Sequence, residues 1–284
     1  MSTGLFRPAS VEEAVALLTR MPEAKIISGG ASLVAMINAR IAEPEALVSL
    51  ADIRELQGVS ELPAGGFRIG AMTRHREVAA ETRFTGTLEI VQRAASVIAN
   101  ATVRNMGTIG GAMAHADPGL DYPPALVAAD ARIEIASLAG RRQVPAQQFF
   151  VDWYATVLQT GELVAAVCLP AAKPGVGIYH KFARVAGDYA TVSVALTIAR
   201  VGEGIVTRAA IGGCGPIPIL IDEANRLLSG RPGGGEVRRA GELLQTAADP
   251  IDDVRGSAEY RRMLIPRMLE RAFTEARAAT GVRI

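Results

Sequence analysis

The sequence predicts an α+β protein made of two packed units. The first observation is length, because single hydrophobic cores rarely grow beyond about 250 residues and this chain has 284. The second is a change of pattern, from strands mixed with helices to β-rich segments followed by helices. The third is the segment 171–177 (AAKPGVG), whose proline and glycines suit a linker. We therefore expect one unit over residues 1–172 and a second over residues 177–284.

The first unit is expected to begin with a capped helix. Ser10 and Glu13 have the spacing of a capping box, and Val11, Val15 and Leu18 recur on one helical face. The further elements expected in this unit are a buried strand at 24–27, a helix at 32–40, strands at 46–50 and 67–72, a helix at 88–99, and strands at 132–136 and 163–169. The stretch 104–124 shows no period and is interpreted as the least regular part of the chain.

The second unit is expected to contain a hairpin and then helices. Two β-rich segments, 188–201 and 205–211, flank Gly202-Glu203-Gly204, which suits a hairpin turn. Helical patterns follow at 222–228, at 237–247 and at 258–278. We find no internal repeat.

Composition and charge exclude several classes of protein. The chain has 30 Lys plus Arg against 29 Asp plus Glu and no long basic run, so nucleic acid is not an expected partner. Two cysteines, Cys168 and Cys214, are too few for an iron–sulfur cluster or a disulfide framework. Residues 1–8 lack the pattern of a secretory signal, and no uncharged apolar run reaches the roughly 18 residues that a membrane span needs. A cytoplasmic location is expected.

The common catalytic motifs are absent from the sequence. It contains no G-x-x-x-x-G-K-[ST], no G-x-G-x-x-G and no H-E-x-x-H. The three histidines, His75, His115 and His180, are far apart in sequence, and neither cysteine has metal-ligand spacing. A mononuclear metal site or a hydrolase triad therefore has little support.

Two glycine-rich loops remain as candidate sites. The first, Ser28-Gly29-Gly30-Ala31-Ser32, lies between an expected strand and an expected helix, where backbone N–H groups can approach an anion. An ordinary tight turn explains this loop alone equally well. The second, Arg104-Asn105-Met106-Gly107-Thr108-Ile109-Gly110-Gly111-Ala112, offers glycines, a hydroxyl and nearby Arg and Asn donors. Two such loops about eighty residues apart suit a diphosphate held from two sides, which indicates a dinucleotide; a structural loop with solvated Asp residues is the alternative for the second.

The two loops and their flanking segments resemble a known flavoprotein family. That family comprises the medium subunit of aerobic carbon monoxide dehydrogenase and the flavin domain of xanthine dehydrogenase. The resemblance rests on the first loop with Leu33, on the segments 101–118 (ATVRNMGTIGGAMAHADP) and 181–190 (KFARVAGDYA), and on 256–262 (GSAEYRR). It covers essentially the whole chain, and the second loop and the segment 181–190 are its most specific parts.

The resemblance implies a fold and a set of cofactor-binding residues. The implied fold is a two-lobed FAD-binding domain of the vanillyl-alcohol-oxidase-like (PCMH) type, followed by a smaller domain with an antiparallel sheet and helices. Matching positions identify residues 28–33, Arg104 and residues 108–112 as binding FAD. Asp121 is expected near the adenosine, Leu163 and Lys181 beside the cofactor, and Tyr189 near the isoalloxazine ring. No catalytic side chain and no metal ligand are expected on this chain.

The resemblance also implies a function and partners. The chain is expected to be the FAD-carrying electron-transfer subunit of a molybdenum hydroxylase. It would take electrons from the [2Fe–2S] clusters of a small subunit and pass them to an external acceptor. A large subunit would hold the molybdopterin cofactor, in a dimer of heterotrimers.

Two departures from the family pattern bear on the scaffold alternative, and two rival functions remain open. Ala31 and Ala112 stand where the family often has residues with hydrogen-bonding side chains. Each loss is expected to weaken diphosphate binding by about 0.5–1.5 kcal/mol. One rival is a stand-alone FAD oxidase or dehydrogenase of the vanillyl-alcohol-oxidase type. The other is a scaffold subunit that keeps the fold without the cofactor.

Overall fold

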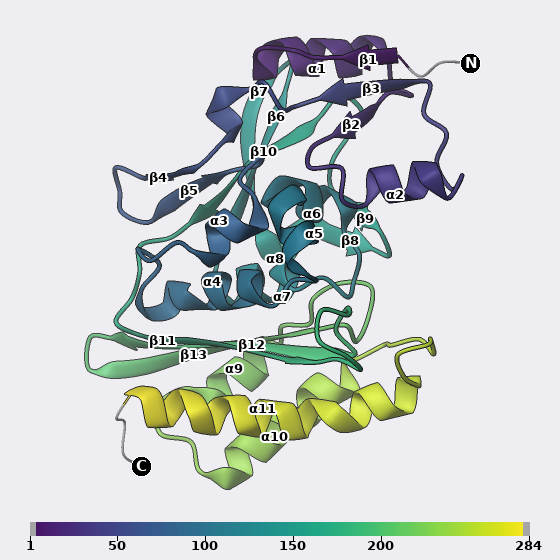
Figure 1. The fold of residues 1–284 in the computed structure, drawn as a ribbon. Helices are drawn as coiled ribbons and strands as arrows, with labels where there is room; N and C mark the ends of the chain where they lie inside the picture. The colour runs from purple at the N-terminus through teal and green to yellow at the C-terminus, as the bar shows by residue number, and fades with distance from the viewer. Residues whose placement is uncertain (1–3, 281–284) are drawn as a thin grey trace.

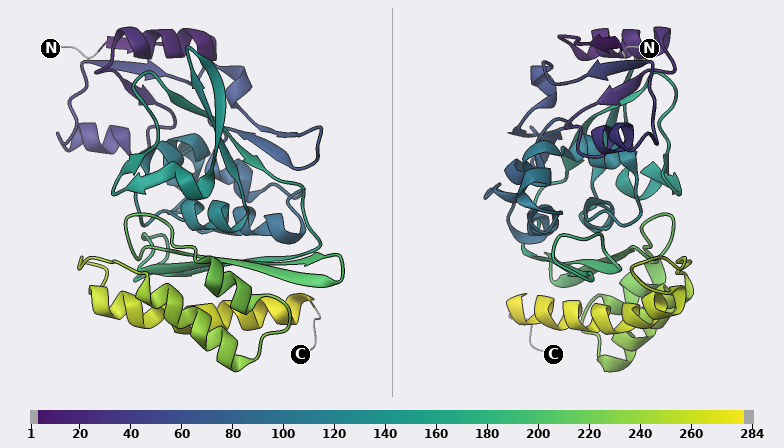
Figure 2. Two further views of the ribbon diagram at one scale, coloured as in Figure 1. Left: turned by 180° about the vertical axis from the view of Figure 1, so that it is seen from behind. Right: turned by 45° about the vertical axis from the view of Figure 1, so that its right-hand side comes forward.

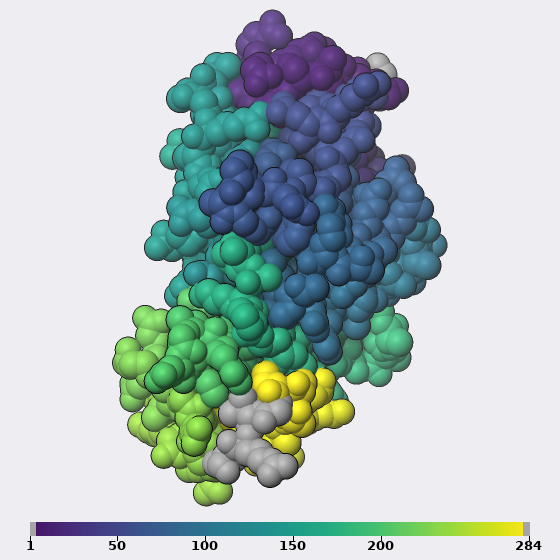
Figure 3. Space-filling view, turned by 90° about the vertical axis from the view of Figure 1, so that its left-hand side faces the viewer, coloured from purple at the N-terminus to yellow at the C-terminus, as the bar shows by residue number. Residues whose placement is uncertain are grey.

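The computed structural model describes residues 4–280. The chain forms an elongated body in which sheets and helices alternate from the N-terminal end to the C-terminal end (Figure 1). Figure 3 shows the first residues at one end of the molecule and the C-terminal helices at the other. Residues 1–3 and 281–284, the outer ends of the two expected units, lie outside the described residues.

The N-terminal lobe is a three-stranded parallel sheet with one helix. The strand order is β1 (Gly4–Phe6), β3 (Ala46–Ser49) and β2 (Lys25–Ile27). Helix α1 (Val11–Arg20) begins as predicted, because the Ser10 hydroxyl accepts the Glu13 N–H at 3.1 Å. Its apolar face packs against β3 in a separate small core. The strand expected to be buried at 24–27 is only half-buried, since a single sheet face is covered here.

The second lobe contains an antiparallel sheet and a group of short helices. The strand order is β4 (Val59–Glu61), β5 (Phe67–Gly70), β10 (Leu163–Leu169), β6 (Arg132–Ser137) and β7 (Gly140–Pro145). Strand β10 is buried at every residue, which explains its continuous apolar sequence. The other small elements are η1 (Arg54–Leu56), α3 (His75–Ala79), η2 (Gly86–Leu88), α4 (Glu89–Ser96), α8 (Ala146–Phe149), β8 (Phe150–Asp152) and β9 (Ala155–Thr156).

The stretch 104–124, interpreted from sequence as irregular, is mostly helical. Helices α5 (Ala101–Met106), α6 (Ile109–His115) and α7 (Tyr122–Ala128) follow one another. Side chains mark the starts of the first two, since Asn100 accepts the Val103 N–H and Thr108 accepts the Gly111 N–H. Each helix has only six or seven residues, which is too short to show a helical period in the sequence.

The C-terminal unit is a three-stranded antiparallel sheet between two layers of helices. Its strands are β11 (Gly175–Phe182), β12 (Val192–Val201) and β13 (Gly204–Gly212). Helices α9 (Asp222–Leu228), α10 (Gly234–Thr246) and α11 (Ala258–Thr280) cover one face, and α4 and α7 contact the other (Figures 1 and 2). The sheet therefore joins the two units through a shared core.

Two expectations for this unit were wrong in detail. Residues 188–191 are not part of a strand, because β12 begins only at Val192. The expected linker 171–177 ends inside β11, which the sequence did not predict as a strand. A Cβ on Gly177 would lie 2.6 Å from the Ile90 backbone nitrogen, so glycine is needed for β11 to pack closely on α4.

Within residues 4–280, none of the helices combines the length and the apolar character that crossing a bilayer demands.

Candidate functional site

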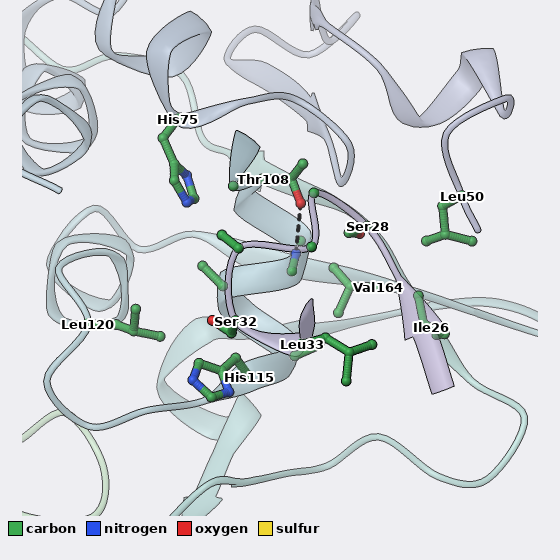
Figure 4. Close-up of a pocket in the computed structure, with 18 of the residues that line it drawn as sticks. Ile26, Ser28, Ser32, Leu33, Leu50, His75, Thr108, His115, Leu120 and Val164 are labelled. Atoms are coloured by element: carbon green, nitrogen blue, oxygen red, sulfur yellow. Dashed lines mark hydrogen bonds between the residues drawn. The ribbon is translucent and has the colours of Figure 1, made fainter. Parts of the chain in front are cut away.

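A cavity of about 620 Å³ lies between the N-terminal lobe, the central helices and the C-terminal unit. Leu18, Ile26 and Leu50 form its wall in the N-terminal lobe, and Lys181 and Tyr189 form its wall in the C-terminal unit. Figure 4 shows residues of both glycine-rich loops side by side at this cavity. Its volume is within the range of roughly 300–1,000 Å³ that is usual for small-molecule and cofactor sites.

The structure brings most of the residues expected to bind a cofactor to this one cavity. Arg104 and Ile109 are the exceptions, since neither lines it. The lining residues among those expected are Ser28, Gly29, Gly30, Ala31, Ser32, Leu33, Thr108, Gly110, Gly111, Ala112, Asp121, Leu163, Lys181 and Tyr189.

The first loop presents a row of free backbone donors to the cavity. Gly30 has a φ of 74°, a left-handed conformation that favours glycine. A Cβ on Gly29 would lie 1.8 Å from the Met106 carbonyl oxygen, so this glycine lets the two loops touch. Within residues 4–280, no hydrogen-bond acceptor meets any backbone N–H from residue 29 to residue 33. Such a row of N–H groups is suited to an anion.

The second loop differs from expectation, because its own contacts occupy its donors. The N–H groups of Ile109 and Gly110 donate to the carbonyl oxygens of Thr73 and Ala71 at 3.0 and 2.8 Å. The Gly111 N–H donates to the Thr108 hydroxyl at 3.2 Å, the bond dashed in Figure 4. This loop therefore forms a wall against which the first loop packs, and the first loop carries the free donors.

Arg104 and Ile109 have structural roles in the fold. The Arg104 guanidinium donates to the carbonyl oxygens of Ile98 and Ala99, at 2.7 and 2.9 Å, after the end of α4. The side chain of Ile109 is fully buried in the main core. Arg104 Nη1 and the Ile109 side chain are thus engaged within the fold, and the expected contact of these two residues with a cofactor stays a prediction.

A buried ion pair joins the two units beside the cavity. Asp121, at the start of α7, accepts hydrogen bonds from Lys181 Nζ at 3.0 Å and from the Tyr179 hydroxyl at 2.7 Å. Burial raises the pKa of Asp121, and the Lys181 charge and the Tyr179 hydrogen bond oppose that rise only in part. Lys181 also donates to the Val97 carbonyl oxygen at 3.3 Å. Both side chains are thus fixed where β11 meets the central helices.

Asp121, which is expected near an adenosine, lies close to Tyr189 in the chain fold. Gly119, two residues earlier, packs against Tyr189, and its carbonyl oxygen accepts the Ala190 N–H at 3.3 Å. Asp121 and Tyr189 therefore lie at the same end of the cavity. The expected places of Asp121 near the adenosine and of Tyr189 near the isoalloxazine ring both stay predictions.

A network of charged side chains contacts the Tyr189 ring and its segment. The Arg255 guanidinium lies 5.0 Å from the centre of the Tyr189 ring and forms an ion pair with Asp188 at 3.0 Å. Arg255 also lies 3.7 Å from a carboxylate oxygen of Asp253, which in turn pairs with the buried Arg261. These contacts fix the segment 188–191, which was predicted from sequence to be the start of a strand.

His75 and His115 also line the cavity, which the sequence analysis did not predict. From sequence, the histidines were candidates only for a metal site or a hydrolase triad. His75 follows the end of β5 and His115 ends α6, so both project from elements that frame the second loop. Within residues 4–280, no group of His, Cys, Asp and Glu could hold a metal ion.

Comparisons with known proteins agree over the whole chain. A family model described as the FAD binding domain in molybdopterin dehydrogenase matches residues 1–172. A second, described as the CO dehydrogenase flavoprotein C-terminal domain, matches residues 177–276. The carbon monoxide dehydrogenase medium chain of Hydrogenophaga pseudoflava is 35% identical over 273 residues, 95% of each chain. The xanthine dehydrogenase FAD-binding subunit of Escherichia coli O157:H7 is 29% identical, over 98% of this chain and 97% of that one.

Solved structures also match this chain over nearly its whole length. Carbon monoxide dehydrogenase from Hydrogenophaga pseudoflava has a chain with a TM-score of 0.93 and 34% identity, covering 98% of both chains. Quinoline 2-oxidoreductase from Pseudomonas putida 86 gives a TM-score of 0.91 and 30% identity, covering 99% of both.

Proposed function

The chain belongs to the family of FAD-binding medium subunits of molybdenum hydroxylases, and from this premise we propose that it works as the electron-transfer subunit of such a complex. FAD is the cofactor of this chain. It takes electrons from a partner that carries [2Fe–2S] clusters and passes them to an external acceptor. The substrate of the complex is hydroxylated on another subunit, which carries the molybdopterin cofactor.

The row of free N–H groups on the first loop is the observation that carries this proposal. Residues 29–33 face the cavity with their backbone donors unpaired, as a site for an anion requires. A Cβ on Gly111 would lie 3.4 Å from Ser28 Cβ, so residue 111 stands directly beside the first loop, where a larger side chain would reach into the cavity. The cavity and its donors therefore fit a dinucleotide diphosphate, with loop 28–32 as its main ligand.

The two ends of the cavity receive the two ends of FAD. We assign the isoalloxazine to the end lined by Tyr189, Lys181 and Asp121, where Arg255 fixes the tyrosine ring. The adenosine then lies in the N-terminal lobe, near Ile26 and Leu50. This assignment replaces the adenosine role expected of Asp121 and makes that carboxylate a partner of Lys181 beside the flavin. Leu163 and Ala112 line the cavity between the two ends.

FAD supplies the redox chemistry, since its ring accepts and releases electrons singly or in pairs. The residues of this chain bind, orient and shield it. Lys181 Nζ lies 3.0 Å from a carboxylate oxygen of Asp121, which fixes the lysine side chain at the flavin end. Tyr189 covers the cavity on its C-terminal side. Proton transfer by a side chain is not needed for this role.

The names of the relatives support the proposed partners. They include medium chains of carbon monoxide dehydrogenase and glyceraldehyde dehydrogenase, and a medium subunit of nicotine 6-hydroxylase. Such matches over the full chain favour the subunit of a complex over a stand-alone oxidase or a cofactor-less scaffold. We propose an assembly of two heterotrimers, each with an iron–sulfur small subunit and a molybdopterin large subunit, in the cytoplasm.

Gentle purification from the native host tests this function. Flavin, iron and molybdenum are assayed in the peak that contains this chain. One FAD per chain, with iron and molybdenum on two co-purifying chains, is the expected result. FAD in a peak without metals or partners would contradict the electron-transfer role and point to a stand-alone flavoenzyme, and a colourless chain that ignores added FAD would point to a scaffold.

A further inference from the structure

His75 is a buried polar side chain that the fold leaves without a partner. The residue is 5% exposed, lines the cavity, and its Nδ1 has neither solvent contact nor a hydrogen bond within residues 4–280. Figure 4 shows its imidazole pointing from α3 toward the loops of the cavity. Buried polar groups are almost always paired, so an unpaired one at a cavity calls for an explanation.

One nitrogen of the His75 ring faces the protein interior, and the other faces the cavity. Nδ1 is enclosed, whereas Nε2 is not among the enclosed unpaired atoms and forms no hydrogen bond of its own. A neutral imidazole carries its proton on one nitrogen only. An unpaired buried acceptor is less costly than an unpaired buried N–H. The proton is therefore on Nε2, which can donate into the cavity.

Nε2 lies next to the loop that carries the free backbone donors. A Cβ on Gly107 would lie 2.5 Å from His75 Nε2, so the imidazole rests against that glycine. A Cβ on Gly29 would in turn lie 3.0 Å from the Gly107 Cα. The Gly107 backbone thus contacts both the imidazole of His75 and the first loop. An anion held by residues 29–33 would therefore lie on the side of the cavity that His75 lines.

We propose that His75 is a further cofactor ligand, donating a hydrogen bond from Nε2 to the diphosphate of the dinucleotide held on the first loop. This rests on the proposed function, since the ligand is the FAD assigned to the cavity. The backbone donors of loop 28–32 bind one side of the diphosphate and the imidazole binds it from the side of α3.

The imidazole is neutral at pH 7 when no anion is bound. Burial, together with the charge of the Arg104 guanidinium, lowers the pKa of His75 to about 4. The titratable and charged groups that face the ring are Arg104 on α5 and Tyr122 on α7, whose ring lies 5.4 Å away. A bound diphosphate adds negative charge beside the ring and raises the pKa of His75.

Replacing His75 with phenylalanine tests the proposal, with Tyr122→Phe as the matched control. The Tyr122 hydroxyl is also buried and unpaired and its ring contacts His75, but Tyr122 does not line the cavity. Without FAD, both variants should unfold at or above the wild-type temperature, because each removes an unsatisfied polar group. FAD binding should weaken about 10- to 100-fold in His75→Phe, remain unchanged in Tyr122→Phe, and recover in part in His75→Gln.

A spectroscopic measurement on the wild-type chain covers the case in which His75→Phe does not fold. The ¹⁵N resonance of His75 Nε2 should shift when FAD is added, and the pKa of the ring should rise. Unchanged resonance and pKa, or equal FAD affinities in wild type and His75→Phe, would overturn the proposal while leaving FAD binding by the wild type intact. Equal loss of folding stability and FAD affinity in both Phe variants would make His75 a core residue. A wild type that binds no FAD would refute the proposed function itself.

Discussion

Gly110 and Gly111 are neighbours in sequence, but they serve different parts of the molecule. A Cβ on Gly110 would lie 2.4 Å from the Ala71 Cβ and 2.8 Å from the Ala71 Cα, inside the contact between α6 and the end of β5. A Cβ on Gly111 would lie 3.0 Å from the Thr108 hydroxyl and 3.4 Å from the Ser28 Cβ, at the cavity. Both glycines line the cavity, but only Gly110 is tightly packed against backbone, and Gly111 stands beside the first loop.

Valine at these two positions should therefore give opposite outcomes. Gly111→Val should remain folded and lose FAD binding by at least tenfold, because the side chain enters the space between the loops. Gly110→Val should unfold at lower temperature, since overpacking a core typically costs about 1–3 kcal/mol. Thermal unfolding without cofactor and FAD titration together separate the two effects. A folded Gly111→Val chain with wild-type affinity would remove the second loop from the proposed site.

At the scale of elements, three strands of the second lobe share a buried carboxylate. Glu134 on β6 pairs with Arg68 on β5 at 3.0 Å, across the intervening β10, and with Arg141 on β7 at 2.9 Å. Burial raises the pKa of Glu134, but hydrogen bonds and charge attraction from Arg68 and Arg141 outweigh burial, and the net pKa lies below 4.5. The carboxylate therefore stabilises the sheet in its charged form.

The substitution Glu134→Gln should lower the free energy of unfolding at pH 7 by about 2 kcal/mol, between the values typical of surface and fully buried ion pairs. Because the folded-state pKa is lower than the unfolded one, this stability is present above pH 4.5 and is lost as pH falls through the folded-state pKa. Denaturant titrations at pH 7 and pH 3 measure both values. The control is Glu55→Gln, whose partner Arg141 is half-exposed and whose effect should be at most about 1 kcal/mol. If wild type and Glu134→Gln still differ in their free energy of unfolding at pH 3, the loss of stability comes from the packing of the glutamine side chain and not from the lost charge.

The sequence predicts those elements whose signals are local. The helix after Ser10, the strand β10 and the helix α9 are confirmed, since a cap, a continuous apolar run and a helical period mark them within a few residues. Strand β11 was not predicted, because its burial depends on α4 and α11, which are remote in sequence. The short helix α6 was also missed: its start depends on the Thr108 side chain, and seven residues are too few for a period.

The candidate site likewise combines features that local sequence signals show with contacts that form only in the folded chain. The two glycine loops can be found from sequence, because each combines glycines with a hydroxyl side chain just before a helix begins, although a tight turn explains the first loop equally well. The occupation of Arg104 by carbonyl oxygens of Ile98 and Ala99 is a tertiary feature, and no motif shows it. His75 is likewise identified only by what surrounds it, namely Gly107, Tyr122 and the cavity.

At the scale of the whole molecule, the cavity exists only where the two units meet. Its walls come from the N-terminal lobe, from α6 and from the segment 181–189 of the C-terminal unit. The Lys181–Asp121 pair and the hydrogen bond from Ala190 to Gly119 join these walls. A ligand that contacts all of these walls stabilises the packed arrangement of both units. The reason is that any motion that separates the walls must first release the ligand.

Hydrogen exchange with and without FAD should reveal this coupling. At an FAD concentration 100-fold above Kd, binding adds about 2.7 kcal/mol to the stability of the state that binds it. Exchange should therefore slow at residues 28–33, 107–113 and 181–190 together, by up to about 100-fold for openings that require release of FAD. Helix α10 serves as the internal control, since its main contacts are with α9 and α11 and none of its residues lines the cavity, so its exchange should slow least. Slowing confined to the first two segments would exclude the C-terminal unit from the site and leave Tyr189 and Lys181 without the assigned contact to the flavin.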